Sequence, residues 1–174
     1  MKNWRAPEDW QKITTIDAHT AGEPFRVITS GFPPLAGATI LDKRRFVKEK
    51  YDHLRTALML EPRGHADMYG CLVTPPVTDD ADFGVLFMHN EGFSTMCGHG
   101  IIAMTTVALE CGMVAMRTPQ ATLRIDTPAG LVTSCARIEE DRVRSVSFRN
   151  VPSFVIDLDQ LVDVPGIGPV RYDL

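Results

Sequence analysis

The sequence contains none of the short motifs that mark common nucleotide and hydrolase sites. No GxGxxG, Walker A or GxSxG pattern occurs among its 174 residues, so dinucleotide binding, P-loop chemistry and serine hydrolysis have no support. It has only four cysteines, which stand far apart at Cys71, Cys97, Cys111 and Cys135. Because they form no CxxC pair, the sequence predicts neither a zinc ribbon nor a thioredoxin-like redox site.

Long hydrophobic runs and an excess of positive charge are missing too. No apolar stretch approaches the roughly 20 residues of a transmembrane helix. Residues 1–12 form a polar N-terminal segment without the apolar core of a signal peptide. We therefore expect a cytoplasmic protein with reduced thiols and no membrane partner. The net charge is −4, and the basic run at 43–45 is followed by mixed charges. That run is typical of a solvated helix face, so we expect no nucleic-acid partner.

What the sequence does contain is a helix with almost no polar face. It is predicted to begin at the Gly-His-Gly run at 98–100 and to continue to Glu110, with Gly112 as its stop. A helix on a protein surface shows an apolar stripe, whereas one that is apolar nearly all round is buried. We therefore expect the central helix of a folded domain.

Cys97 stands at the N-terminal tip of this helix and is the strongest catalytic candidate. The tip has unpaired N–H groups and the positive end of the helix dipole. Those N–H groups, at Gly98, His99 and Gly100, could hold a small anion, and the two glycines let the backbone approach it closely. A cysteine there is expected to have a lowered pKa and thiolate character. The alternative is a small hydrophobic side chain buried at a helix start.

Four further residues lie in turns that could border the same site. His65 follows a sharp Arg-Gly turn, and His89 ends an apolar run. Their spacing from the cysteine matches no metal-ligand pattern, so no metal is predicted and the alternative is a turn-stabilising role. Glu23 and Glu91 stand in glycine turns, where either could position a substrate amine or hydroxyl. The alternative for both is a solvated turn carboxylate.

The remaining pattern predicts an α+β fold. One amphipathic helix is expected from about Thr39 to Leu60, because apolar residues recur there at helical spacing. About ten short strands surround the buried helix, and those after it form an antiparallel meander because their connections are short. The predicted strands are 13–19, 25–29, 68–75, 83–89, 121–127, 131–138, 143–149, 154–158, 162–164 and 169–173. The sequence ends in the middle of a strand pattern, which suggests a chain that has been cut off.

Several segments resemble the proline racemase family, which also contains hydroxyproline 2-epimerases and trans-3-hydroxy-L-proline dehydratases. The segments are IDAHTAGEPFRV (16–27), DHLRTALMLEPRGHADMYG (52–70), HNEGFSTMCGHGIIA (89–103) and VSFRNVPSFV (146–155). The resemblance implies a fold like diaminopimelate epimerase, with two similar halves and an active site between them. Each half is a curled, mostly antiparallel sheet around a central helix. Residues 1–174 would be the N-terminal domain, and the C-terminal domain would be absent.

The resemblance also implies roles for individual residues. Cys97 would accept the proton from the α-carbon of proline or hydroxyproline, and the backbone of Gly98 and His99 would bind the substrate carboxylate. No cofactor is implied. Racemases of the family use a second cysteine from the C-terminal half, whereas the HNEGFS version of the motif is more similar to the dehydratase branch, in which threonine replaces that cysteine.

Three functions follow as hypotheses from these observations. The first is dehydration of trans-3-hydroxy-L-proline to pyrroline-2-carboxylate, and the second is racemisation or epimerisation of proline or hydroxyproline. The third is a non-catalytic half, because half of an interdomain site leaves a ligand exposed to water. An exposed half-interface could also pair with a second copy, so a homodimer is expected as one arrangement.

Overall fold

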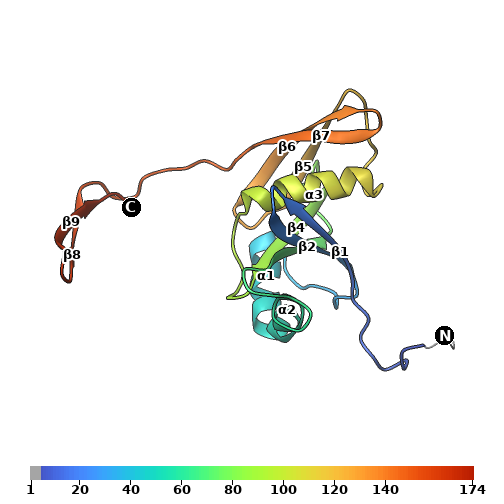
Figure 1. Ribbon diagram of the computed structural model, residues 1–174, viewed down its shortest axis with the longest axis horizontal. Coiled ribbons are helices and arrows are strands. Elements are labelled where there is room, and N and C mark those ends of the chain that lie inside the picture. Colours follow the sequence, from blue (N-terminus) through green and yellow to red (C-terminus); the bar gives the residue numbers. More distant parts are fainter. Residues whose placement is uncertain (1–4) are drawn as a thin grey trace.

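A seven-stranded sheet forms the body of the protein in the computed structural model, which describes residues 5–174 (Figure 1). The first four residues of the polar N-terminal segment expected at 1–12 lie outside that range. The strands stand side by side in the order in which they occur in the sequence. They are β1 (Thr14–Thr20), β2 (Glu23–Ser30), β3 (Tyr69–Thr74), β4 (Phe83–His89), β5 (Gln120–Thr127), β6 (Gly130–Glu139) and β7 (Arg142–Arg149).

The sheet is mixed, and its helices follow from where the parallel pairs occur. Strands β2 and β3 are parallel, as are β4 and β5, and the other neighbours are antiparallel. A parallel neighbour cannot be reached by a tight turn, so each parallel pair needs a crossover. Helices α1 (Ile40–Lys50) and α2 (Asp52–Met59) make the first crossover, and α3 (Gly98–Glu110) makes the second. The α+β class is confirmed, while the curled shape and the likeness to diaminopimelate epimerase stay predictions.

The two crossovers cover the sheet with two separate apolar cores. Helix α3 contacts β1, β2, β3, β6 and β7, whereas α1 and α2 contact β4. Strand β4 serves both cores, because Val85 and Phe87 pack with α3 while Leu86 and Met88 pack with α1 and α2. All four side chains have no exposed surface. A strand that is covered on both faces has apolar residues at consecutive positions rather than at alternate ones, and the sequence of β4 has this pattern.

Helix α3 is buried, as its lack of a polar face predicts. Ile101, Met104 and Ala108 have no exposed surface. Its buried hydroxyl, on Thr105, donates a hydrogen bond of 2.8 Å to Ser134 on β6, so that polar group is satisfied inside the core.

The amphipathic helix expected over residues 39–60 is in fact two helices. Thr39 caps α1 through a capping box with Asp42. The helix ends at Tyr51, whose backbone leaves helical geometry at φ −130° and ψ 19°. Tyr51 packs edge-on against Phe46, with ring centroids 5.6 Å apart, and α2 starts at the next residue. The prediction of one continuous helix is wrong, but the predicted face is kept, because α1 and α2 both turn apolar residues into one core.

The antiparallel meander stops at β7, which corrects the expected course of the chain's last part. No strand forms at 154–158, and β8 (Gln160–Val164) and β9 (Gly168–Tyr172) pair only with each other. Figure 1 shows this hairpin projecting from the body on an extended segment. Apolar side chains of the segment and of the hairpin lie in solvent, with Phe154 of the segment 76% and Ile167 of the hairpin turn 75% exposed. We call residues 150–174 the arm.

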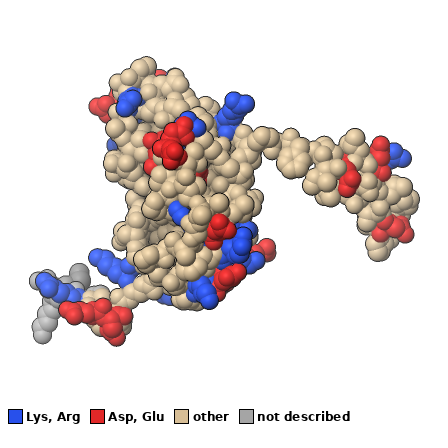
Figure 2. Space-filling view, turned by 180° about the vertical axis from the view of Figure 1, so that it is seen from behind, with Lys and Arg blue, Asp and Glu red and all other residues tan. Residues whose placement is uncertain are grey.

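Charged side chains of both signs share the surface of the body. Figure 2 shows Lys and Arg beside Asp and Glu at the end formed by α1 and α2, and the arm too carries charges, most of them acidic. In residues 5–174, no helix combines the length and the apolar character needed to cross a membrane.

Candidate active site at the N-terminus of α3

Cys97 is the N-cap residue of α3, and its sulfur lies inside the first helical turn. The Gly100 N–H donates a hydrogen bond of 3.3 Å to Cys97 Sγ, and the residue is 7% exposed. The first N–H groups of a helix have no partner within it, and those of Gly98 and His99 belong to this turn. Glycine is required at 100, because a Cβ there would lie 2.6 Å from the ring of Phe25.

His99 packs beside the same sulfur. Its Nδ1 lies 3.3 Å from Cys97 Sγ, and its ring meets those of Phe25 and Tyr69 edge-on, with centroids 5.7 and 5.1 Å away. Its backbone carbonyl accepts a hydrogen bond of 3.0 Å from Thr20 at the end of β1. Strand β1 therefore holds the first turn of α3 in place.

Tyr69 and Ser94 are functional candidates that the sequence analysis missed. The Tyr69 hydroxyl hydrogen-bonds to Ser94 Oγ and interacts with the Cys97 thiol, whose pKa it lowers. A tyrosine hydroxyl has one proton to donate, so a consistent arrangement runs from Ser94 to Tyr69 to the sulfur. Both residues stand inside segments that carry the family resemblance, at the end of EPRGHADMY and within HNEGFS. Their position within those segments is the feature of the sequence that could have identified them.

Burial decides the pKa of the candidate base. It raises the pKa of the Cys97 thiol above its ordinary value, and the hydrogen bonds from Gly100 and Tyr69 act in the opposite direction without cancelling the rise. The lowered pKa predicted from the helix tip is therefore wrong, because the sequence does not show how deep the sulfur lies. Burial likewise raises the pKa of Tyr69, which Ser94 lowers and Cys97 raises further.

A cavity of about 380 Å³ opens beside Tyr69 and brings several predicted residues together. Its lining residues are Glu23, Asp67, Met68, Tyr69, His89, Asn90 and Glu91. The His89 ring stacks on the Tyr69 ring, with centroids 5.4 Å apart. Glu23, His89 and Glu91, which are far apart in the sequence, thus share one wall with the tyrosine that contacts Cys97. The carboxylates make this wall suitable for a cationic amine.

His65 is placed differently from the other predicted residues. Its side chain is exposed, and its Nδ1 lies 2.6 Å from the carbonyl of Ala66. Its backbone carbonyl accepts a hydrogen bond of 2.9 Å from Asn90 Nδ2. The structure therefore gives His65 a supporting contact with the turn that carries His89 and Glu91. Within residues 5–174, no group of three or more His, Cys, Asp or Glu residues is placed to hold a metal ion.

The turn after β4 is held from the opposite layer by Arg55 of α2. Arg55 is 6% exposed, and its guanidinium donates two hydrogen bonds to the Asp52 carboxylate, at 2.6 and 2.9 Å. It also donates to the carbonyls of His89 at 2.8 Å and Asn90 at 2.6 Å. A buried arginine with four such bonds fixes backbone position firmly. The α1 and α2 layer thus reaches the site through the backbone that carries His89.

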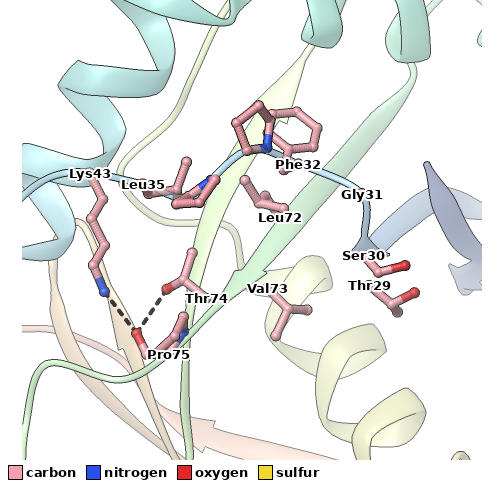
Figure 3. Close-up of a pocket in the computed structure, with 12 residues that line it drawn as sticks. Thr29, Ser30, Gly31, Phe32, Leu35, Lys43, Leu72, Val73, Thr74 and Pro75 are labelled. Carbon is pink, nitrogen blue, oxygen red and sulfur yellow. Dashed lines mark hydrogen bonds between the residues drawn. The ribbon is translucent and has the colours of Figure 1, made fainter. Parts of the chain in front are cut away.

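A second cavity of about 380 Å³ lies away from these residues, where the ends of β2 and β3 separate under the loop at 31–35 (Figure 3). Phe32, Leu35 and Leu72 give it apolar walls. The Lys43 ammonium and the Thr74 hydroxyl both donate to the Pro75 carbonyl, at 2.9 and 3.1 Å. None of the predicted site residues lines it, whereas Glu23, His89 and Glu91 line the cavity beside Tyr69.

Comparison with known proteins agrees with the segments that surround this site. A family model for proline racemase matches residues 15–174. The chain belongs to the proline racemase family. The segment around Cys97 lies within the matched residues, and the resemblance inferred from the sequence is confirmed.

Relatives in this family carry two kinds of name. The chain is 58% identical over 146 residues to a trans-3-hydroxy-L-proline dehydratase of Bacillus thuringiensis subsp. konkukian, covering 84% of this chain and 44% of the relative. It is 47% identical over 164 residues to a 3-hydroxyproline 2-epimerase of Burkholderia multivorans, covering 94% of this chain and 49% of the relative. The chain spans about half the length of the curated relatives that it matches.

A solved structure of the family has the same fold. It is a hydroxyproline epimerase of Agrobacterium vitis with bound trans-4-hydroxy-L-proline, 31% identical to this chain, with a TM-score of 0.86. The match covers 92% of this chain and 48% of the epimerase. The mixed sheet and its three helices are thus those of the proline racemase fold.

Proposed function

We propose that residues 1–174 form one wall of the active site of a trans-3-hydroxy-L-proline dehydratase, in which Cys97 removes the α-proton. The observation that carries the proposal is the position of Cys97 Sγ, inside the first turn of α3 and in contact with Tyr69 at the edge of an acidic cavity. The dehydratase name of the Bacillus thuringiensis relative supports the choice of reaction. The same proposal makes the chain the N-terminal half of a two-domain protein.

The proposal gives the backbone donors of α3 two tasks. The Gly100 N–H already points at Cys97 Sγ, so it stabilises the thiolate rather than the substrate. The N–H groups of Gly98 and His99 remain for the substrate carboxylate, which the helix dipole also favours. Neutralising that carboxylate makes the α-proton more acidic, and the neighbouring thiolate accepts it.

The acidic cavity supplies the other half of substrate recognition. Proline and its hydroxy derivatives carry a secondary ammonium next to the α-carbon, and Glu23, Asp67 and Glu91 border the cavity. Opposite charges at short range favour this orientation of the ring. The chemistry moves protons and one hydroxide only, so the proposed reaction needs no cofactor.

Two other functions have specific support. An epimerase is favoured by the names of the Burkholderia multivorans and Agrobacterium vitis proteins, and it would exchange the α-hydrogen with solvent and form the other isomer. A non-catalytic half is favoured by the span of the match, which covers 44% of the Bacillus thuringiensis relative. We therefore expect residues 1–174 alone to show little turnover. The homodimer stays a prediction.

The test is water loss from trans-3-hydroxy-L-proline by the full-length protein that carries this segment. We expect Cys97→Ser to abolish formation of pyrroline-2-carboxylate, while Cys135→Ser, at a cysteine on β6, serves as the matched control. Formation of the other isomer without water loss would assign the epimerase function instead. Undiminished dehydration by Cys97→Ser would remove the proposed role of Cys97.

A further inference from the structure

The stereochemistry of the proposed substrate places two reacting groups on one face of its ring. In trans-3-hydroxy-L-proline, the 3-hydroxyl lies opposite the carboxylate. The α-hydrogen also lies opposite the carboxylate, because both are bound to the same carbon. The leaving hydroxyl and the departing proton therefore share a face. If Cys97 takes the proton, the wall that contains Cys97 also faces the leaving oxygen.

Hydroxide is a poor leaving group, so that wall must also supply a proton. General acids lie within hydrogen-bonding reach of the atom that they protonate. Among the side chains of this wall, Tyr69 hydrogen-bonds to Ser94 Oγ, interacts with the Cys97 thiol, packs against the His99 ring that contacts the same sulfur, and borders the acidic cavity. It thus stands between the base and the space available to a substrate.

We propose that Tyr69 is the general acid that protonates the departing 3-hydroxyl, and that Ser94 positions it. This inference rests on the proposed dehydratase function. The Cys97 thiolate takes the α-proton, the C3–O bond breaks as the C2–C3 double bond forms, and Tyr69 gives its proton to the oxygen, releasing water. The products are an enamine, a Cys97 thiol and a Tyr69 phenolate.

The interaction between Tyr69 and Cys97 then completes the cycle. A phenolate is ordinarily a stronger base than a thiolate, so the proton moves from Cys97 Sγ to the Tyr69 oxygen. Both groups return to their starting forms, and the overall change is loss of one water molecule from the substrate. A phenolate oxygen can only accept, so Ser94 is the donor in its hydrogen bond with Tyr69 at this stage, and this donation stabilises the phenolate while it exists.

Two histidines are placed less well for this step. His99 contacts Cys97 Sγ through Nδ1, but its ring is held edge-on between Phe25 and Tyr69. His89 lies behind the face of the Tyr69 ring. His99 is the stronger rival, because it reaches the sulfur directly, and it defines the comparison variant.

The experiment compares two leaving groups in the full-length protein. Fluoride leaves without a proton, so trans-3-fluoro-L-proline needs the base but not the acid. We expect Tyr69→Phe to slow water loss from trans-3-hydroxy-L-proline by about 10²–10⁴-fold, the usual contribution of a general acid. Fluoride loss from the fluoro substrate should fall by less than about tenfold, through the lost interaction of Tyr69 with the Cys97 thiol.

Ser94→Ala and His99→Gln complete the set. We expect Ser94→Ala to lower the ratio of water loss to fluoride loss in the same direction as Tyr69→Phe but less, which tests the role even where Tyr69→Phe folds poorly. Equal loss of both reactions in Tyr69→Phe would make Tyr69 merely structural, and a changed ratio in His99→Gln alone would transfer the role to His99. If the unaltered protein eliminates neither group, the proposed function fails before this inference is reached.

Discussion

The two helical layers on the sheet differ in what they contribute. Helix α3 is buried almost all round and carries Cys97 at its tip, whereas α1 and α2 bury one face and keep charged residues on the other. Both pack on β4, which places alternate side chains in each layer. The chemistry therefore belongs to the α3 side, and the opposite side contributes core packing and the Arg55 contacts behind the site. If the two layers differ in this way, substitutions in the α3 layer should mainly lower activity, and substitutions in the α1 and α2 layer should mainly lower stability.

The largest effect on activity is expected from Gly100→Ala, on the α3 side of the sheet. The added Cβ would lie 2.6 Å from the Phe25 ring and 3.0 Å from Cys97 Sγ, so the first turn must shift away from the geometry that serves the thiolate. A misplacement of about 1 Å at a reacting group can cost about 10²-fold in rate. Turnover by the full-length protein measures this. Gly92→Ala, where a Cβ would meet nothing within 4 Å, is the matched control, and equal losses in both variants would contradict the explanation.

Leu86→Ala tests the opposite layer. Leu86 has no exposed surface and packs with α1 and α2, so its truncation leaves a cavity. We expect the free energy of unfolding to fall by about 2–5 kcal/mol, measured by denaturant titration, with turnover per folded molecule nearly unchanged. A loss of turnover larger than the loss of folded protein would show that the two layers are not independent.

The third prediction concerns how stability and turnover depend on pH, because both depend on the protonation of Cys97 in the α3 layer. Burial raises the pKa of its thiol, so the folded protein holds the proton to higher pH than the unfolded chain does. Its contribution to stability is complete below the ordinary pKa of cysteine and is lost as pH rises through the folded value. Turnover should rise over the same window, because the thiolate is the base. Tyr69→Phe removes a donor to the sulfur and should move the rise in turnover to higher pH in a pH–rate profile.

The smallest effect is expected in the arm, which neither layer covers. Ile167 is 75% exposed, so Ile167→Ser should change the free energy of unfolding of residues 1–174 by no more than about 0.5 kcal/mol. Thermal unfolding of this chain measures the change. A much larger loss would mean that the hairpin packs on the body or on another chain in solution.

The buried helix and the cysteine at its tip could be predicted from the sequence, because both depend on local pattern. A helix without a polar face is buried wherever it occurs, and a glycine run before it marks its start. Most strands of the body were predicted for the same reason. The break at Tyr51 was not, since the spacing of apolar residues is the same in one straight helix and in two helices that share a face.

The contacts around Cys97 could not be predicted, because they join residues that are distant in sequence. Tyr69 and Ser94 are 25 positions apart, and no periodicity connects the start of β3 with the turn after β4. The pKa of Cys97 was predicted in the wrong direction for a related reason. Helix position is a local property, whereas burial depends on Phe25, Tyr69 and the sheet around them.

Strand β4 has a further consequence for how the protein fluctuates. Strand β4 is paired with β3 along one edge and with β5 at Phe83 and Gly84 on the other, and Val85, Leu86, Phe87 and Met88 have no exposed surface. Its amide hydrogens are therefore expected to be shielded from solvent unless the body opens as a whole. The turn that carries His89 and Glu91 starts at its end, and the segment to Cys97 follows. In hydrogen exchange, we expect β4 to be among the last segments to take up deuterium and the segment from 90 to 96 to exchange far sooner. Motions of the cavity beside Tyr69 can then occur while its anchor in the sheet stays closed.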